Sequence, residues 1–237
     1  MDLEIITSFF SEFVTDERKA KIEEILAQRT EHFHVVVEDT YQEHNAGAIV
    51  RSCDCFGVQQ LSVIENINEF NVSEGMARGA EKWIDVNYFH GSESGIQNCI
   101  DHLRSDDYQI VATVPYPDAA SMNDFDITNK SAFFFGRERE GLSQQIIDQA
   151  DANLFIPMVG FTSSLNVSVS VAIVLQTLTH RLRNESSVNW QLSDQRKQLL
   201  RLIWYYNSIP NKQKMLVAYL KSHPEIDRKE LRTYIKF

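Results

Sequence analysis

The chain has 237 residues, 43% of them hydrophobic, so it can bury the core of one large domain or of a domain with a small appendage. Its formal net charge of −10 argues against a surface coated by nucleic acid, although a local basic patch stays possible. With no apolar run of membrane-spanning length, no secretory signal and only three cysteines, the chain is expected to be a cytosolic protein without a disulfide framework.

Hydrophobic periodicity predicts two helices at the front of the chain, followed by an alternation of strands and helices. Residues 3–13 place apolar side chains at helical spacing, and Thr15 is expected to cap a second helix with an acidic first turn. Strands are predicted at 34–37, 61–64, 84–89, 108–114, 132–135 and 154–156, and helices at 45–56, 96–104, 143–150 and 164–183. This alternation predicts an α/β fold with a mostly parallel sheet.

The character of the chain changes after Arg183. A polar linker covers 184–189, and the rest of the chain is amphipathic and helical, with breaks at Pro210 and Pro224. We therefore predict an N-terminal helical extension over 1–30, a main domain over 31–183 and a C-terminal helical extension over 184–237.

Three segments carry polar residues that an ordinary core would not contain. They read HNAGAIVRSCDCFGV (44–58), FFFGREREGLS (133–143) and FIPMVGFTSSLNVSVSVAIVL (155–175). A buried polar group without a partner costs about 1–3 kcal/mol, so three such segments are expected to converge on one site.

Each motif by itself excludes several kinds of site but does not identify a function. The turn from Gly136 to Ser143 resembles a P-loop, but Leu142 stands where the lysine would be, and no G-x-G-x-x-G pattern marks a dinucleotide site. No second Cys/His pair completes a zinc pattern, so no metal is expected. Ser164 fits an N-cap of the long helix. Asn45 and Arg51 are expected on broadly one face of a helix, where the arginine needs a partner, either a carboxylate such as Glu138 or an anionic ligand.

Together the three segments resemble the TrmH (SpoU) family of RNA ribose 2′-O-methyltransferases in the SPOUT superfamily. The resemblance runs from about residue 30 to 183 and matches Asn45, Arg51 and Phe56-Gly57, the turn 136–143, and the run from Ile156 to Ser168. It implies an α/β fold with a C-terminal trefoil knot, S-adenosylmethionine as cofactor, and a homodimer whose active sites lie at the subunit interface.

The resemblance also implies roles for single residues. Catalytic or positioning roles fall to Arg51, Asn45, Glu138, Ser164 and Asn166. Arg51 would be either the base or an electrostatic activator for the 2′-hydroxyl, and Glu138 would orient Asn45 or Arg51. Cofactor contacts would come from Thr113, Gly136, Gly141, Ile156, Met158 and Leu165.

The helical extensions and the segment from Arg78 to Trp83 resemble the subgroup that methylates a guanosine in the D-loop of tRNA. The expected RNA contacts are Arg18, Lys19, Arg29, His44 and Lys82, although basic residues on helices can equally be solvated surface. Two alternatives stay open: a ribosomal RNA 2′-O-methyltransferase of the same family, and a non-enzymatic RNA-binding protein with this fold.

Overall fold

The computed structural model describes residues 3–72, 75–116, 119–224 and 226–235. The chain divides into two compact units. The sheet unit is Thr30–Gln191, and the helical unit combines Met1–Arg29 with Leu192–Phe237. Among the described residues, no helix combines the length and the apolar character that crossing a membrane requires.

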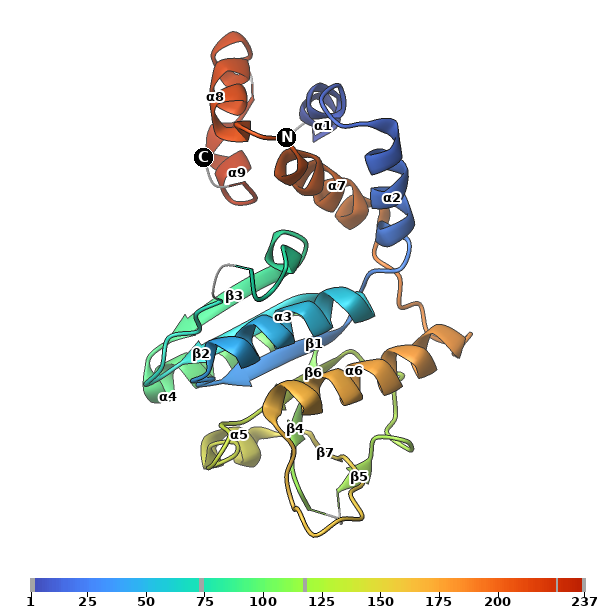
Figure 1. The fold of residues 1–237 in the computed structure, drawn as a ribbon, viewed down its shortest axis with the longest axis vertical. Helices are drawn as coiled ribbons and strands as arrows, with labels where there is room; N and C mark the ends of the chain where they lie inside the picture. The colour runs from blue at the N-terminus through green and yellow to red at the C-terminus, as the bar shows by residue number, and fades with distance from the viewer. Residues whose placement is uncertain (1–2, 73–74, 117–118, 225, 236–237) are drawn as a thin grey trace. The chain divides into compact units, whose positions relative to one another are not determined.

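The sheet unit is built on a parallel sheet (Figure 1). Its strands, in the order in which they lie side by side, are β3 (Asp85–His90), β2 (Val58–Glu65), β1 (Thr30–Glu38), β6 (Ser131–Phe135), β4 (Gln109–Thr113), β7 (Ala152–Phe155) and β5 (Ala120–Ser121). Each of these neighbouring pairs is parallel. The carboxyl ends of the strands therefore lie at one edge, which is where ligands bind in parallel α/β sheets.

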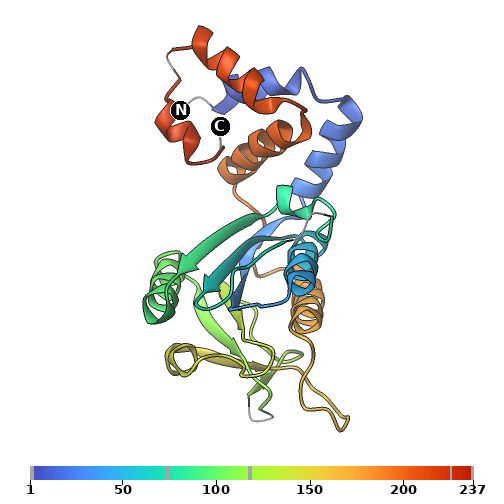
Figure 2. The same ribbon diagram turned by 60° about the vertical axis from the view of Figure 1, so that its left-hand side comes forward.

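Helices cover both faces of this sheet (Figure 2). On one face lie α3 (Glu43–Phe56) and α6 (Val167–Asn184), and on the other lie α4 (Ser92–Ser105) and α5 (Gln144–Gln149). Strand β1 serves both cores because successive side chains of a strand point to opposite faces. Val35 and Val37 belong to the core under α3 and α6, whereas Val36 belongs to the core under α4 and α5.

The helical unit consists of α1 (Leu3–Ser11), α2 (Asp16–Leu26), α7 (Asp194–Ser208), α8 (Lys212–Ser222) and α9 (Arg228–Arg232). Helices α1 and α2 both pack on α7, where Phe10 and Trp204 are buried. The predicted cap of α2 is confirmed, since the Thr15 hydroxyl accepts a hydrogen bond from the Arg18 N–H at 3.3 Å.

The predicted parallel α/β fold is confirmed, and the trefoil knot stays a prediction. The strand β5 was not predicted, because two residues carry no periodicity. The polar linker that was predicted after Arg183 lies in the sheet unit: the Thr30 hydroxyl donates to the Trp190 carbonyl at 2.6 Å, and Arg183 lies 5.7 Å from the centre of the Trp190 ring.

Candidate functional site

The centre of the site is the amide of Asn45, in the first turn of α3 and 1% exposed. Its Nδ2 donates to the Glu138 carboxylate and, at 3.2 Å, to Gln42 Oε1. Its Oδ1 accepts from Asn166 Nδ2 at 3.1 Å and lies 3.2 Å from the hydroxyl of Ser168. All three sequence motifs therefore meet at this one amide, which is what the sequence predicts.

Asn166 has a second task, because it is the N-cap of α6. Its Oδ1 accepts from the N–H groups of Ser168 at 2.9 Å and Val169 at 3.4 Å. The prediction that Ser164 caps this helix is therefore wrong: the helix begins at Val167, so Ser164 lies two residues too early to reach its first N–H groups. Ser164 instead lines the neighbouring pocket.

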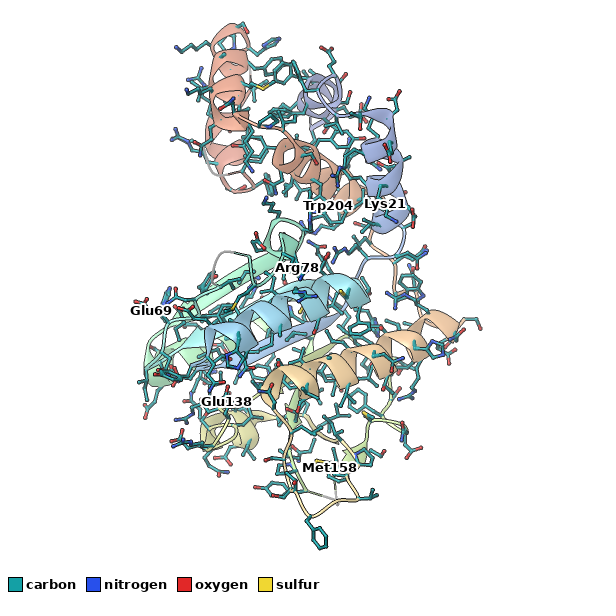
Figure 3. The ribbon with its side chains drawn as sticks, viewed as in Figure 1. Lys21, Glu69, Arg78, Glu138, Met158 and Trp204 are labelled. Carbon is teal, nitrogen blue, oxygen red and sulfur yellow. The ribbon has the colours of Figure 1, made fainter. Side chains whose placement is uncertain are left out.

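Glu138 is presented by a tight turn between β6 and α5. Arg137 and Gly141 exchange backbone hydrogen bonds of 3.0 Å, and Gly141 takes a left-handed φ of 71°. A Cβ on Gly136 would lie 2.2 Å from the carbonyl carbon of Gly141, a distance that no side chain can occupy. Glycine is thus required at both ends of the turn, and Figure 3 shows Glu138 held beside the start of α3.

A buried carboxylate that sequence reasoning missed lies under this turn. Glu38 ends β1, is 1% exposed and accepts the N–H of Ser143 at 2.8 Å. The guanidinium of Arg137 lies 4.0 Å from its other oxygen. A buried charge of this kind requires partners. The glutamate at the end of the apolar run VVVE could therefore have indicated a site residue in the sequence.

A pocket of about 460 Å³ opens beside the network at the carboxyl edge of the sheet. The cofactor residues predicted from the sequence all line it: Thr113, Gly136, Gly141, Ile156, Met158 and Leu165. The Thr113 hydroxyl is tied to the Phe134 carbonyl at 2.6 Å, and Met158 lies on the segment that joins β7 to α6 (Figure 3). This volume and the apolar walls from Leu142, Leu154 and Ile156 suit the adenosine part of a cofactor.

Arg51 is not part of the network. The expectation that it shares a helix face with Asn45 is wrong, because six residues at 3.6 per turn separate two side chains by about 240°. Asn45 is buried, whereas Arg51 is exposed and has no hydrogen bond or ion pair with any residue that the structure describes. Glu138 was expected to orient Asn45 or Arg51, and it contacts Asn45.

The residues predicted to contact RNA are divided between the units. In the helical unit Arg18 is exposed and Lys19 pairs with Asp16 at 3.1 Å, while in the sheet unit His44 and Lys82 are exposed. Arg29 is a correction: it is 1% exposed and lies 5.2 Å from the centre of the Trp204 ring, so it is a core residue of the helical unit.

Comparisons with known proteins agree with this geometry. Residues 32–176 match the model of the SpoU rRNA Methylase family. The tRNA (guanosine(18)-2′-O)-methyltransferase of Borreliella burgdorferi is 40% identical over 203 residues, which cover 86% of this chain and 91% of that protein.

Solved structures show the same likeness. The Aquifex aeolicus TrmH/SpoU tRNA modifying enzyme has a TM-score of 0.70 at 28% identity, over 83% of this chain and 98% of that one. The SpoU methyltransferase AviRb from Streptomyces viridochromogenes, in complex with AdoMet, shares the fold with a TM-score of 0.56 at 21% identity, over 68% and 65% of the two chains.

Proposed function

Since the chain belongs to the SpoU rRNA methylase family, we propose that it methylates the ribose 2′-hydroxyl of a guanosine in tRNA, with S-adenosylmethionine as donor. The observation that carries the proposal is the Asn45 amide, which joins Glu138, Asn166 and Ser168 beside the 460 Å³ pocket. The guanosine and the tRNA are supported by the relative from Borreliella burgdorferi, which covers most of the chain.

The residues that line the pocket are assigned to the cofactor. Backbone around Thr113, Ile156 and Leu165 would hold its adenosine part, and the glycine turn 136–141 leaves the backbone open to close approach. When bound, S-adenosylmethionine supplies an electrophilic methyl group. The solved SpoU neighbour that carries AdoMet has the same fold, which supports this assignment.

The chemistry that falls to the protein is alignment and charge stabilisation. A ribose hydroxyl is a poor nucleophile at neutral pH, and holding it in line with a methyl group can lower the barrier by about 7–11 kcal/mol in favourable cases. The Asn45 network is preorganised for this, because each of its members is fixed by another. Arginine side chains are poor proton acceptors, so we assign Arg51 the stabilisation of negative charge that develops on the 2′-oxygen.

This role requires that Arg51 lie close to the 2′-hydroxyl that reacts. Arg51 is exposed and has no contact with the Asn45 network, on a helix whose other face is buried against the sheet. We propose a homodimer in which the subunit interface completes the site, as the resemblance implies. We also propose that the protein acts in the cytoplasm, where its RNA substrate is found.

The proposal is tested by incubating the protein with radiolabelled S-adenosylmethionine and, separately, with unmodified tRNA transcripts and ribosomal RNA. Label at a D-loop guanosine, resistant to alkaline cleavage, is the expected result. Label in ribosomal RNA alone would keep the reaction and replace the substrate. Arg51→Ala should fold as the unmodified chain does and lose at least about 100-fold in kcat, since typical losses of one charge-stabilising group are of that order. Full activity of that variant would overturn the role of Arg51.

A further inference from the structure

A second hollow, of about 530 Å³, lies at the carboxyl ends of β2 and β3, on the same edge of the sheet as the Asn45 network. The residues of its lining that matter here are Glu65, Asn68, Glu69, Asn71, Tyr88 and His90. None of these residues belongs to the cofactor pocket, and nothing in the methyl-transfer site uses them.

Two partly exposed aromatic rings line this hollow. Tyr88 and His90 lie on the same side of the edge strand β3, with their rings 9° from parallel and their centres 6.4 Å apart. Tyr88 is 47% exposed, and the side chain of His90 is 71% exposed. His90 does not rotate freely, because its Nδ1 lies 2.7 Å from the carboxylate of Glu65. Parallel, exposed and oriented rings are what an unstacked nucleobase stacks on.

The backbone of the loop that lines this hollow is bound to one buried carboxylate. A single carboxylate oxygen of Asp39 accepts the backbone N–H groups of Asn66, Ile67 and Asn68, at 3.3, 2.9 and 2.8 Å. Asp39 is 3% exposed and has a φ of 55°, and it lies in the connection between β1 and the helix that carries Asn45. The loop of the hollow is therefore anchored on the connection that leads to Asn45.

The polar groups of the hollow suit a base and not a phosphate. The side-chain amides of Asn68 and Asn71 have no hydrogen-bond partner among the described residues, so both are available to the edge of a base. The carboxylates of Glu65 and Glu69 repel a phosphate. The cations nearest in sequence, Arg78 and Lys82, are exposed outside this lining and can take the RNA backbone.

We propose that this hollow holds one unpaired base of the RNA, immediately 5′ or 3′ of the methylated nucleotide, stacked on Tyr88 and His90. The inference rests on the proposed function, since it names a second recognition site for the same RNA. A base bound here would restrict the position of the neighbouring ribose. The 2′-hydroxyl of that ribose would then be held at the Asn45 network.

The test uses the full-length protein and an unmodified tRNA transcript that carries 2-aminopurine, in turn, on each side of the methylated guanosine. Binding of the unmodified chain should quench the fluorescence at one of the two positions by stacking. Tyr88→Ala should abolish that quenching and raise the Kd for the transcript about 10-fold, whereas Tyr88→Phe, which keeps the ring, should stay within about twofold. The Kd for S-adenosylmethionine should not change in either variant, which shows that the sheet unit is folded.

Salt dependence separates stacking from loss of charge. Tyr88→Ala should leave the slope of log K against log salt unchanged, while Lys82→Ala should make it shallower, because only the lysine releases a counterion. Normal binding by Tyr88→Ala, an equal loss with Tyr88→Phe, or the absence of quenching at both positions would overturn the inference. If the unmodified chain labels tRNA and Tyr88→Ala does so equally well, this inference fails and the proposed function stands. If the unmodified chain labels no tRNA, the proposed function fails.

Discussion

The replacement Asn45→Asp isolates the contact between Asn45 and Glu138. The new carboxylate keeps the shape of the amide and can still accept from Asn166 and Ser168, but it places a second negative charge against Glu138. Two unit charges about 4 Å apart repel by about 4 kcal/mol at an effective dielectric constant of about 20. Because Glu138 is exposed and water screens it, we expect a net loss of about 1–3 kcal/mol in the free energy of unfolding at pH 8.

The loss should depend on pH in a defined direction. In the folded variant the two neighbouring carboxylates retain one shared proton around pH 6. In the unfolded chain side-chain carboxyls titrate near 4, so that proton has already been released at this pH. The folded variant then binds more protons than its unfolded state, so the stability of the variant relative to that of the unmodified chain rises as pH falls from about 8 to about 5. Urea unfolding at both pH values measures it.

The control for this prediction is the pair Asn45→Asp with Glu138→Gln, which restores one donor and one acceptor at the contact. The double variant should recover the lost stability at pH 8 and return to the pH dependence of the unmodified chain. The same pH dependence in Asn45→Asp as in the unmodified chain, or no rescue by Glu138→Gln, would refute the reasoning. Methyl transfer by Asn45→Asp should fall at pH 8 together with stability, because the same amide positions Asn166 and Ser168.

Gly136→Ala should raise the Kd for S-adenosylmethionine by more than about 10-fold in calorimetry, because its Cβ would lie 2.2 Å from backbone of the turn; Gly160→Ala is the matched control, since the nearest atom there is 3.9 Å away. Burial lowers the pKa of His34 from 6.5 to about 3. The neutral imidazole therefore contributes its whole stabilisation above about pH 6.5, and this contribution is lost as pH falls below that value. His34→Gln should reduce the pH dependence of the free energy of unfolding below pH 6.5 by about one proton. Arg29→Ala should destabilise the helical unit by about 2 kcal/mol or more, because it removes a buried contact with the Trp204 ring. The exposed Arg18 is the control: Arg18→Ala should change stability by less than about 0.5 kcal/mol, and it should make the dependence of tRNA affinity on salt concentration shallower.

Local pattern was sufficient for most of the fold. The apolar run at 34–37 and its flanks predict a buried strand, and β1 is buried along nearly its whole length. Gly57 was expected to end the helix at 45–56, and it does so with a left-handed φ of 75°. The end of α6 was predicted one residue short, but its start was predicted three residues early, because several Ser and Asn side chains in a row can each act as an N-cap.

The sequence by itself determined the residue types that meet at the site, because the family motifs fix Asn45, Glu138 and Asn166 at recognisable spacings. Which of them touch was decided by tertiary structure. Glu138 bonds to Asn45 and leaves Arg51 exposed, Glu38 holds the turn from beneath, and Arg29 is drawn into the core by Trp204. Each of these outcomes depends on contacts between residues 93, 105 or 175 positions apart. Periodicity describes only neighbours along one helix or strand, so burial and pairing over such separations follow from how the elements pack.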